Sequence, residues 1–236
     1  MTIVDSAVVL VPQDGRLDEA HAVARAVAAP GGRFAAVDNE AGNRHVLDLC
    51  RRRPERFAGL AVANPWYGAR AVRGLEAAFA AGLVGLFLDP PRQGFRLTEA
   101  QVDPLIEVCR RYRRPVYAHV GTPVCAMPFQ LAELARRFPD VTFIMGHQGW
   151  PDFCGYDDVP AARQAANVLL ETSCAFSGSV QAAFDALGPQ RLLFGSGYPR
   201  SDLGVELAKL RRLGLAPEHE RMVLGGNALR VWGIEP

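Results

Sequence analysis

Two of the five histidines in this 236-residue chain follow short apolar runs in the same local position. His119 ends the apolar run of VYAHVGTP (116–123), and His147 ends that of VTFIMGHQGW (141–150). An imidazole exchanges protons readily near neutral pH, because its unperturbed pKa is about 6.5. We interpret these two residues as a candidate acid–base pair, or as two ligands of one metal ion. The remaining histidines lie in or near helical patterns and are assigned no role: His21, His45 and His219.

Polar and aromatic side chains also follow the other apolar runs, where they could surround a small-molecule substrate. The candidates for substrate binding are Trp66, Tyr117, Trp150, Tyr198, Arg200, Asp89 and Glu171. The four aromatic residues could form a wall of the pocket. For Trp150 and Tyr198 the structural alternative is packing within their own loops.

The charged candidates each have a structural alternative too. Arg200 could bind a carboxylate in bidentate geometry, or it could form a surface ion pair with Asp202. Asp89 could cap a turn before the proline that follows it. Glu171 is expected near a barrel interior, where a carboxylate would need a hydrogen-bonding partner.

The elements that must position these residues alternate between apolar runs and helical patterns. The expected strands are 6–12, 33–38, 56–65, 84–91, 116–123, 141–150, 167–174 and 191–197. The expected helices are 17–29, 43–54, 69–82, 98–115, 129–140, 157–167, 179–190, 203–213 and 218–231. Continuous apolar strands, each followed by a helix, indicate a parallel sheet that is buried on both faces. The chain has no glycine-rich nucleotide motif, which favours a (β/α) barrel of the TIM type. We expect this barrel to span residues 1–236 as a single domain, with its chemistry at the carboxyl ends of the strands.

Composition excludes several classes of protein. The formal net charge is +1, which gives no reason to expect nucleic acid or an anionic membrane as a partner. There is no apolar run of roughly 18 residues and no signal-peptide pattern, so we expect a cytoplasmic protein. The five cysteines lack CxxC spacing, which argues against a disulfide framework and a structural zinc site. Cys125 has no evident cation to lower its pKa and is treated as a spectator thiol.

Five segments together resemble the amidohydrolase-related family of metal-dependent TIM-barrel enzymes, which includes aminocarboxymuconate-semialdehyde decarboxylase. The segments are YAHVGTP, FIMGHQGW, NVLLETSCAF, RLLFGSGYPRSD and VLGGNALRVWGI. The resemblance implies that His119 is the metal-binding histidine of strand five. It also implies that His147 is the strand-six histidine, which acts beside the metal.

The chain departs from the family pattern at two places. Family members carry an HxH pair on strand one and an aspartate in a GSDxP phrase after strand eight. No HxH occurs in this chain, and the corresponding phrase is GSGYP with Gly197 at the aspartate position. The first apolar run resembles the second strand of the family, so we expect strand one to be missing or the barrel to be distorted. A start upstream of Met1 would restore the histidine pair but not the aspartate.

A missing strand would leave two strand edges unpaired, which invites association. The run 33–38 could fill the gap, the barrel could close with seven strands, or a homodimer could cover both edges.

These departures shape the functional expectation. A catalytic zinc site needs about three protein ligands, and only His119 and His147 are clear candidates, so we expect no metal or a weakly bound one. A carboxylate from Asp89, Glu171 or Asp202 could complete a zinc or iron site. We expect histidine-mediated acid–base chemistry on a small aromatic or polyketide-like acid: isomerisation, cyclisation, dehydration or decarboxylation. The alternatives are an inactive binding or scaffolding barrel and a conventional metal-dependent hydrolase or decarboxylase.

Overall fold

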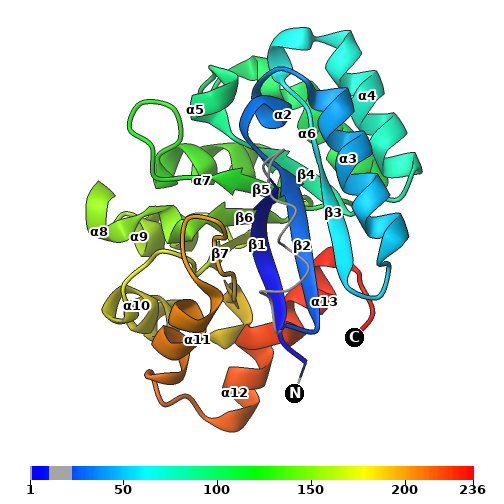
Figure 1. Ribbon diagram of the computed structural model, residues 1–236. Helices are drawn as coiled ribbons and strands as arrows, with labels where there is room; N and C mark the ends of the chain where they lie inside the picture. The colour runs from blue at the N-terminus through cyan, green and yellow to red at the C-terminus, as the bar shows by residue number, and fades with distance from the viewer. Residues whose placement is uncertain (1, 11–22) are drawn as a thin grey trace.

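The computed structural model describes residues 2–10 and 23–236, in which eight parallel strands form one sheet in sequence order (Figure 1). The strands are β1 (Val4–Leu10), β2 (Arg25–Pro30), β3 (Phe57–Val62), β4 (Gly85–Leu88), β5 (Val116–His119), β6 (Phe143–Gly146), β7 (Val168–Glu171) and β8 (Leu192–Leu193). The segment after β8 returns to β1, where the amide of Ser6 donates to the carbonyl of Phe194 at 3.0 Å and that of Val9 donates to the carbonyl of Tyr198 at 2.9 Å. The expected TIM-type barrel is therefore confirmed, and it is nearly closed.

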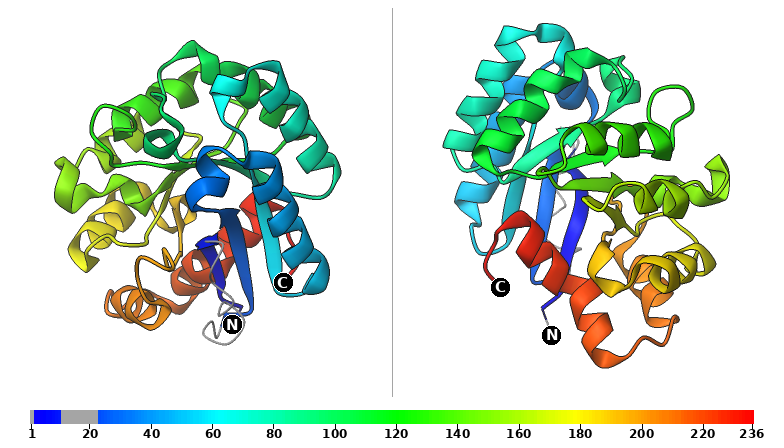
Figure 2. Two further views of the ribbon diagram at one scale, coloured as in Figure 1. Left: turned by 45° about the horizontal axis from the view of Figure 1, so that its top comes forward. Right: turned by 180° about the vertical axis from the view of Figure 1, so that it is seen from behind.

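Helices surround the strands on the outside, as Figure 2 shows. They are α2 (Gly32–Ala36), α3 (Asn39–Arg52), α4 (Ala69–Ala80), α5 (Pro90–Gln93), α6 (Asp103–Tyr112), α7 (Pro128–Arg137), α8 (Pro151–Cys154), α9 (Asp158–Arg163), α10 (Ser177–Leu187), α11 (Leu203–Arg211), α12 (Pro217–Arg221) and α13 (Asn227–Trp232). Their apolar faces follow helical periodicity; in α7 the buried face includes Leu131, Leu134 and Ala135. Within the described part of the chain, no helix is long and apolar enough to span a bilayer.

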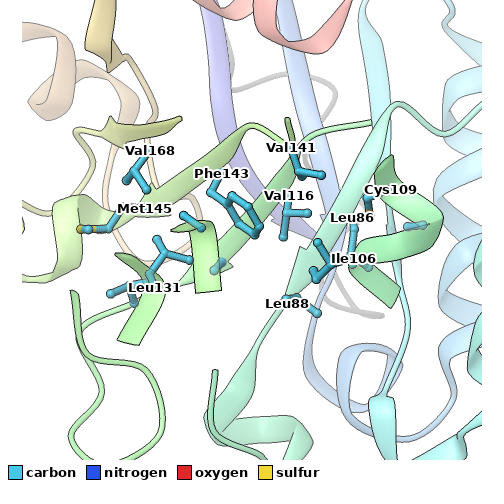
Figure 3. Close-up of a cluster of buried hydrophobic side chains, with 14 of the residues drawn as sticks. Leu86, Leu88, Ile106, Cys109, Val116, Leu131, Val141, Phe143, Met145 and Val168 are labelled. Atoms are coloured by element: carbon cyan, nitrogen blue, oxygen red, sulfur yellow. The ribbon is translucent and has the colours of Figure 1, made fainter. Parts of the chain in front are cut away.

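Strand alternation divides the core into two layers and decides which side chains reach the site. The outer layer, between strands and helices, includes Val116, Phe143 and Met145 (Figure 3). The inner layer fills the barrel and includes Tyr117 of β5. Because successive side chains of a strand point to opposite faces, Tyr117 and His119 share the inner face. The histidine therefore stands one step above the tyrosine, at the carboxyl end of the strand.

Two expected elements are wrong, and together they restore the strand that we expected to be missing. Residues 25–29, expected as part of a helix, lie in β2, and residues 33–36 of the expected strand 33–38 lie in helix α2. The run 25–30 is rich in alanine, which favours helices in isolation, but its burial on both faces favours a strand. In α2 only Ala35 is buried, so this segment cannot serve as a core strand.

The edges that motivated the expected homodimer are consequently paired with each other. The barrel is nevertheless distorted at β1, whose register against β2 shifts between Asp5 and Val8. Residues 11–12 of the first expected strand, the first part of the helix expected at 17–29 and His21 lie outside the described residues.

Trp232 of α13 closes the amino-terminal end of the barrel, where it is 1% exposed within the inner layer. Replacing it by alanine should lower the free energy of unfolding by about 3–5 kcal/mol, because a large cavity would remain. Trp66→Ala is the matched control: this side chain is 61% exposed, and we expect a loss below about 1 kcal/mol. Urea unfolding followed by circular dichroism measures both values. Equal losses in the two variants would contradict this account of the core.

Candidate functional site

The two predicted histidines meet at the carboxyl end of the barrel. His119 ends β5 and pairs in register with Gly146, the last residue of β6, so His147 begins the following turn at the same level. Nδ1 of His119 and Nε2 of His147 lie 3.2 Å apart, and the two rings meet edge to face with centroids 4.8 Å apart. His147 is buried and His119 is partly exposed. The structure thus brings the pair together at one mouth, whereas their catalytic role remains a prediction.

An unusual turn holds His147 in place. His147, Gln148, Gly149 and Trp150 all have positive φ, at 56°, 50°, 69° and 51°. Left-handed conformations of non-glycine residues cost roughly 1–3 kcal/mol each and persist only where neighbouring structure holds them. Here the amide of Trp150 donates to the carbonyl of His147 at 2.8 Å, and the side-chain amide of Gln148 donates to Asp158 at 2.7 Å. The turn directs both the imidazole and the indole toward the mouth.

A buried carboxylate supports the histidine from below. Glu171 is fully buried, and its Oε2 accepts hydrogen bonds from the Tyr117 hydroxyl at 2.7 Å, the His147 amide at 3.0 Å and the Ser173 hydroxyl at 2.9 Å. Its Oε1 accepts from the Ser173 amide at 2.6 Å. Gly195 leaves room for this carboxylate, since a Cβ there would collide with Oε1. The partner that the sequence analysis required for Glu171 is therefore a set of four donors.

Hydrogen-bond directions follow from this arrangement. Ser173 donates its hydroxyl proton to Glu171, so its oxygen is free to accept from Nδ1 of His147, 2.8 Å away. His147 then carries its proton on Nδ1 and keeps a lone pair on Nε2, the atom that faces His119. Glu171 and Ser173 thus fix the orientation and the tautomer of His147.

Burial keeps both imidazoles neutral. It lowers the pKa of His119 from 6.5 to about 4, with smaller contributions from Arg200 and Arg92. It lowers the pKa of His147 well below its ordinary value, with His119 and Arg200 acting in the same direction. Burial also raises the pKa of Glu171 to about 7, against the opposing effect of its hydrogen-bond donors. Near neutral pH both rings are therefore uncharged, and each keeps one nitrogen lone pair.

Cationic and aromatic groups form the rim. The Arg200 guanidinium lies over the Trp150 ring, 4.9 Å from its centroid, and that ring meets the His147 ring at 5.6 Å. The sequence also offered a surface ion pair between Arg200 and Asp202. Asp202 instead caps α11 by accepting from the Val205 amide at 3.1 Å.

At the end of β4, Asp89 forms an ion pair with Arg92 at 3.0 Å rather than a cap. Arg92 was not among the predicted site residues, because its spacing of three residues from Asp89 is common on helix surfaces and does not by itself indicate a site.

The remaining candidates lie elsewhere. Trp66 is exposed, and its indole donates to the carbonyl of Gly94 at 2.8 Å, with no recorded contact to either histidine of the pair. Tyr117 lies below the histidines in the barrel, bound to Glu171. Tyr198 is half-buried and packs against the outer core. His45 packs against Phe34 and His219 packs against Phe184.

The positions that depart from the family pattern are apolar or empty of side chain. On β1, Ala7 and Val9 are two residues apart and belong to the inner layer, with no polar atoms in their side chains. Gly197 has φ of +66°, and a Cβ there would lie 2.9 Å from the Ser173 hydroxyl and 3.1 Å from the Cys174 sulfur. Ser173 and Cys174 therefore occupy the space next to the expected aspartate position.

The histidine pair offers two metal ligands. The two ring nitrogens that lie 3.2 Å apart would be the ligands that this pair could offer to one ion. His147 also has the hydrogen-bonded second nitrogen that metal-bound imidazoles require. Glu171 accepts four hydrogen bonds, Asp89 pairs with Arg92, and Asp202 caps α11. Residues 2–10 and 23–236 accordingly contain no group of three side chains that could hold a metal ion.

The pKa of His119 makes stability depend on pH in a definite direction. The unfolded chain binds this proton more tightly than the folded one, so the folded state loses stability as pH falls from about 6.5 toward 4. Between about pH 7 and pH 4.5, with a chelator present, the free energy of unfolding should fall by about 2–3 kcal/mol more in the wild type than in His119→Gln. Urea unfolding at a series of pH values measures the difference. Parallel curves for the two proteins would show that His119 is not desolvated.

Several solved structures share this architecture. A 5-carboxyvanillate decarboxylase from Sphingomonas paucimobilis superposes with a TM-score of 0.80 at 15% identity, covering 99% of each chain. A 2,6-dihydroxybenzoate decarboxylase from Rhizobium gives 0.77 at 17% identity, again covering 99% of each chain. A dihydroxybenzoic acid decarboxylase from Polaromonas sp. JS666, with bound manganese and 2-nitroresorcinol, gives 0.74 at 17% identity, covering 98% of this chain and 97% of its own. At such identities the similarity establishes the fold.

These structures correct the expectation about the cofactor. Three of them contain manganese: the Polaromonas enzyme and two structures of 5-carboxyvanillate decarboxylase from Novosphingobium aromaticivorans. The expectation of an absent or weakly bound metal is therefore wrong, because structures of this architecture hold manganese.

Sequence comparison gives the family directly. No curated protein sequence matches the chain. The sequence model of the amidohydrolase family, by contrast, matches residues 9–234, which is nearly the whole chain. The protein belongs to the amidohydrolase family.

Proposed function

We propose that the protein is a lyase that decarboxylates a small aromatic acid at the mouth formed by His119 and His147. The observation that carries the proposal is the pair of neutral imidazoles 3.2 Å apart, anchored to a buried carboxylate and flanked by Arg200. The decarboxylases of similar fold act on aromatic acids, which supports the same class of substrate.

Decarboxylation of a hydroxylated aromatic acid needs a proton at the ring carbon that loses its carboxylate. The carbon–carbon bond breaks, its electron pair stays with the ring, and carbon dioxide leaves. A neutral His119 accepts the proton of the substrate hydroxyl, which raises electron density on the ring. The resulting imidazolium then donates this proton to the ring carbon, and solvent returns a proton to the phenolate. His119 is neutral before substrate binds, as this sequence of steps requires.

The other groups position the reactants. Arg200 binds the carboxylate as a planar donor, and the Trp150 ring beneath it offers a flat apolar surface to the substrate ring. His147 holds His119 in place through the 3.2 Å contact, and Ser173 and Glu171 hold His147.

A divalent metal would be held by Nδ1 of His119 and Nε2 of His147, the two nitrogens that face each other. When bound, such an ion supplies Lewis-acid stabilisation of negative charge on substrate oxygens. The lone pair that His147 keeps on Nε2 suits this role, because metal ligands must be deprotonated. No step above depends on the ion.

A second candidate is a binding barrel without turnover. The apolar residues Ala7 and Val9 on the inner face of β1 favour it, as does Gly197 at the aspartate position of the family phrase, because none of the three has a side chain that could bind a metal ion. The two candidates differ in one measurable property: only the enzyme releases carbon dioxide.

Alanine at His119 or at His147 should reduce turnover by at least about 100-fold, because each variant removes the acid–base pair. Release of carbon dioxide from a panel of hydroxybenzoates, with manganese present, measures the activity. His219→Ala is the matched control, since this histidine packs against Phe184 outside the barrel and should leave activity unchanged. Folding is checked by the thermal midpoint of each variant. Full activity in folded His119→Ala would refute the assignment, and a wild type inactive on the whole panel would favour the binding barrel.

Manganese should bind the wild-type protein, and binding should weaken by at least about tenfold in His119→Ala and in His147→Ala, because each removes one of two ligands. Electron paramagnetic resonance of free manganese measures the bound fraction directly. His219→Ala should bind as the wild type does. Equal binding by all four proteins would place the metal elsewhere.

A further inference from the structure

We propose that the amino-terminal end of the barrel carries a second ligand site, a pocket that binds a phosphate group, either free or carried by a small molecule. The pocket has a volume of about 390 Å³, which is within the usual range for sites that take small molecules. Its charged and hydroxyl-bearing lining residues are Arg110, Arg113, Arg114, Asp140 and Thr142. None of them belongs to the histidine site, and the inference does not depend on the proposed function.

The pocket lies where two neighbouring strands begin. Residues 113–115 connect α6 to β5, and residues 140–142 lead from α7 into β6. The Val116 amide donates to the carbonyl of Thr142 at 2.9 Å, which joins the two segments. The histidine pair lies at the other ends of β5 and β6, so the pocket is separate from it. In barrels of this type the amino-terminal end is the face away from the chemistry, which makes this a binding site rather than a second active site.

Positive charge exceeds negative charge in the lining. Three guanidinium groups face one carboxylate, that of Asp140. Arg110 already pairs with Glu107 at 2.6 Å. Neither Arg113 nor Arg114 forms a side-chain hydrogen bond or an ion pair within residues 2–10 and 23–236. Two guanidinium groups at this pocket are therefore available to an anion.

Arg114 is held in place before any ligand binds. Its Nε atom is buried and has no hydrogen-bond partner in the part of the chain that the structure describes. Buried donors of this kind are uncommon in native proteins and require an explanation. The side chain as a whole is half-buried, so the covered Nε fixes its stem while the terminal amino groups remain accessible. A planar guanidinium of fixed orientation suits two oxygens of one anion.

The donors fit a phosphate group better than a carboxylate. A phosphate monoester carries a charge of about −1.5 to −2 near pH 7 and has three acceptor oxygens. Arg113 and Arg114 from one segment and the Thr142 hydroxyl from the other are three donor groups around one pocket. The alternative is that these arginines are only the solvated end of α6, where cations are favoured by the helix dipole. That alternative explains neither the pocket nor the buried Nε of Arg114.

Inorganic phosphate and ribose 5-phosphate test the site, and ribose is the uncharged control. Each is titrated by calorimetry into the metal-free protein at constant ionic strength. Wild type should bind both phosphates with a Kd below about 1 mM and should not bind ribose. Arg114→Gln should weaken phosphate binding at least about tenfold, because it removes the fixed guanidinium. Arg111→Gln is the matched control: it removes the same charge from the same helix, but Arg111 pairs with Glu76 outside the pocket, so binding should stay within about twofold.

Asp140→Asn gives a test in the opposite direction. It removes the carboxylate from the lining and should strengthen phosphate binding at least about twofold, because repulsion of the anion is lost. Weaker binding in this variant would contradict the assignment of the pocket to an anion.

Binding at the histidine site is distinguished by Arg200→Gln, which should bind phosphate as the wild type does. If Arg200→Gln loses phosphate binding and Arg114→Gln keeps it, the phosphate lies at the other end of the barrel and the second site is wrong. A wild type that binds neither phosphate also overturns the site, and neither result bears on the proposed function. Tighter binding of ribose 5-phosphate than of inorganic phosphate would identify a phosphorylated small molecule as the ligand, and equal binding would identify free phosphate.

Arg113→Gln provides the test if Arg114→Gln fails to fold, because Arg113 is exposed and lines the same pocket. It should weaken phosphate binding at least about fivefold. Unchanged binding in this folded variant would overturn the proposal.

Discussion

The site depends on one buried carboxylate. Glu171 lies at the end of β7, and its four hydrogen-bond donors come from β5, from the turn after β6 and from the segment after β7. A carboxylate in such a place costs several kcal/mol unless its oxygens are satisfied. Satisfying them requires the ends of three neighbouring strands to keep fixed positions. The fourth, β8, is followed by a glycine at 195, where a side chain would displace the carboxylate.

Hydrogen bonds that start at Glu171 fix the positions of the two histidines. Glu171 binds the Ser173 hydroxyl, Ser173 binds His147, and His147 contacts His119. These hydrogen bonds suit the site with or without a metal ion. His147 donates through Nδ1 to Ser173 in both cases, while its Nε2 either accepts from His119 or would bind the ion. The left-handed turn at 147–150 is strained by itself and is tolerated because these contacts hold it.

Sequence patterns predicted most of the strands, which depend on hydrophobic periodicity. They did not predict the side-chain contacts between different strands, which depend on tertiary structure. The apolar runs located seven of the eight strands and placed both histidines at one mouth. Strand β2 was misread because its alanines favour a helix locally, and only closure of the barrel overrides that preference. Glu171 was expected near the barrel interior, but its hydrogen-bond donors on β5 and in the turn after β6 could not be read from its own strand. Arg92 was missed because an Asp–Arg pair three residues apart is common on helix surfaces, and the burial of Asp89 is a tertiary property.

The free-energy cost of burying Glu171 bears on the choice between an enzyme and a binding barrel. Much of the inner layer is apolar, including Ala7 and Val9, although Asp5 of β1 is a second buried carboxylate near Tyr117. A pocket that only binds an aromatic acid could be built from such residues and a rim arginine. The chain instead keeps a desolvated carboxylate, a serine bridge and two neutral imidazoles along one edge, with a strained turn to direct them. Buried polar groups of this kind destabilise the fold relative to apolar side chains, but they can transfer protons or bind a cation. Their presence therefore favours chemistry at this edge.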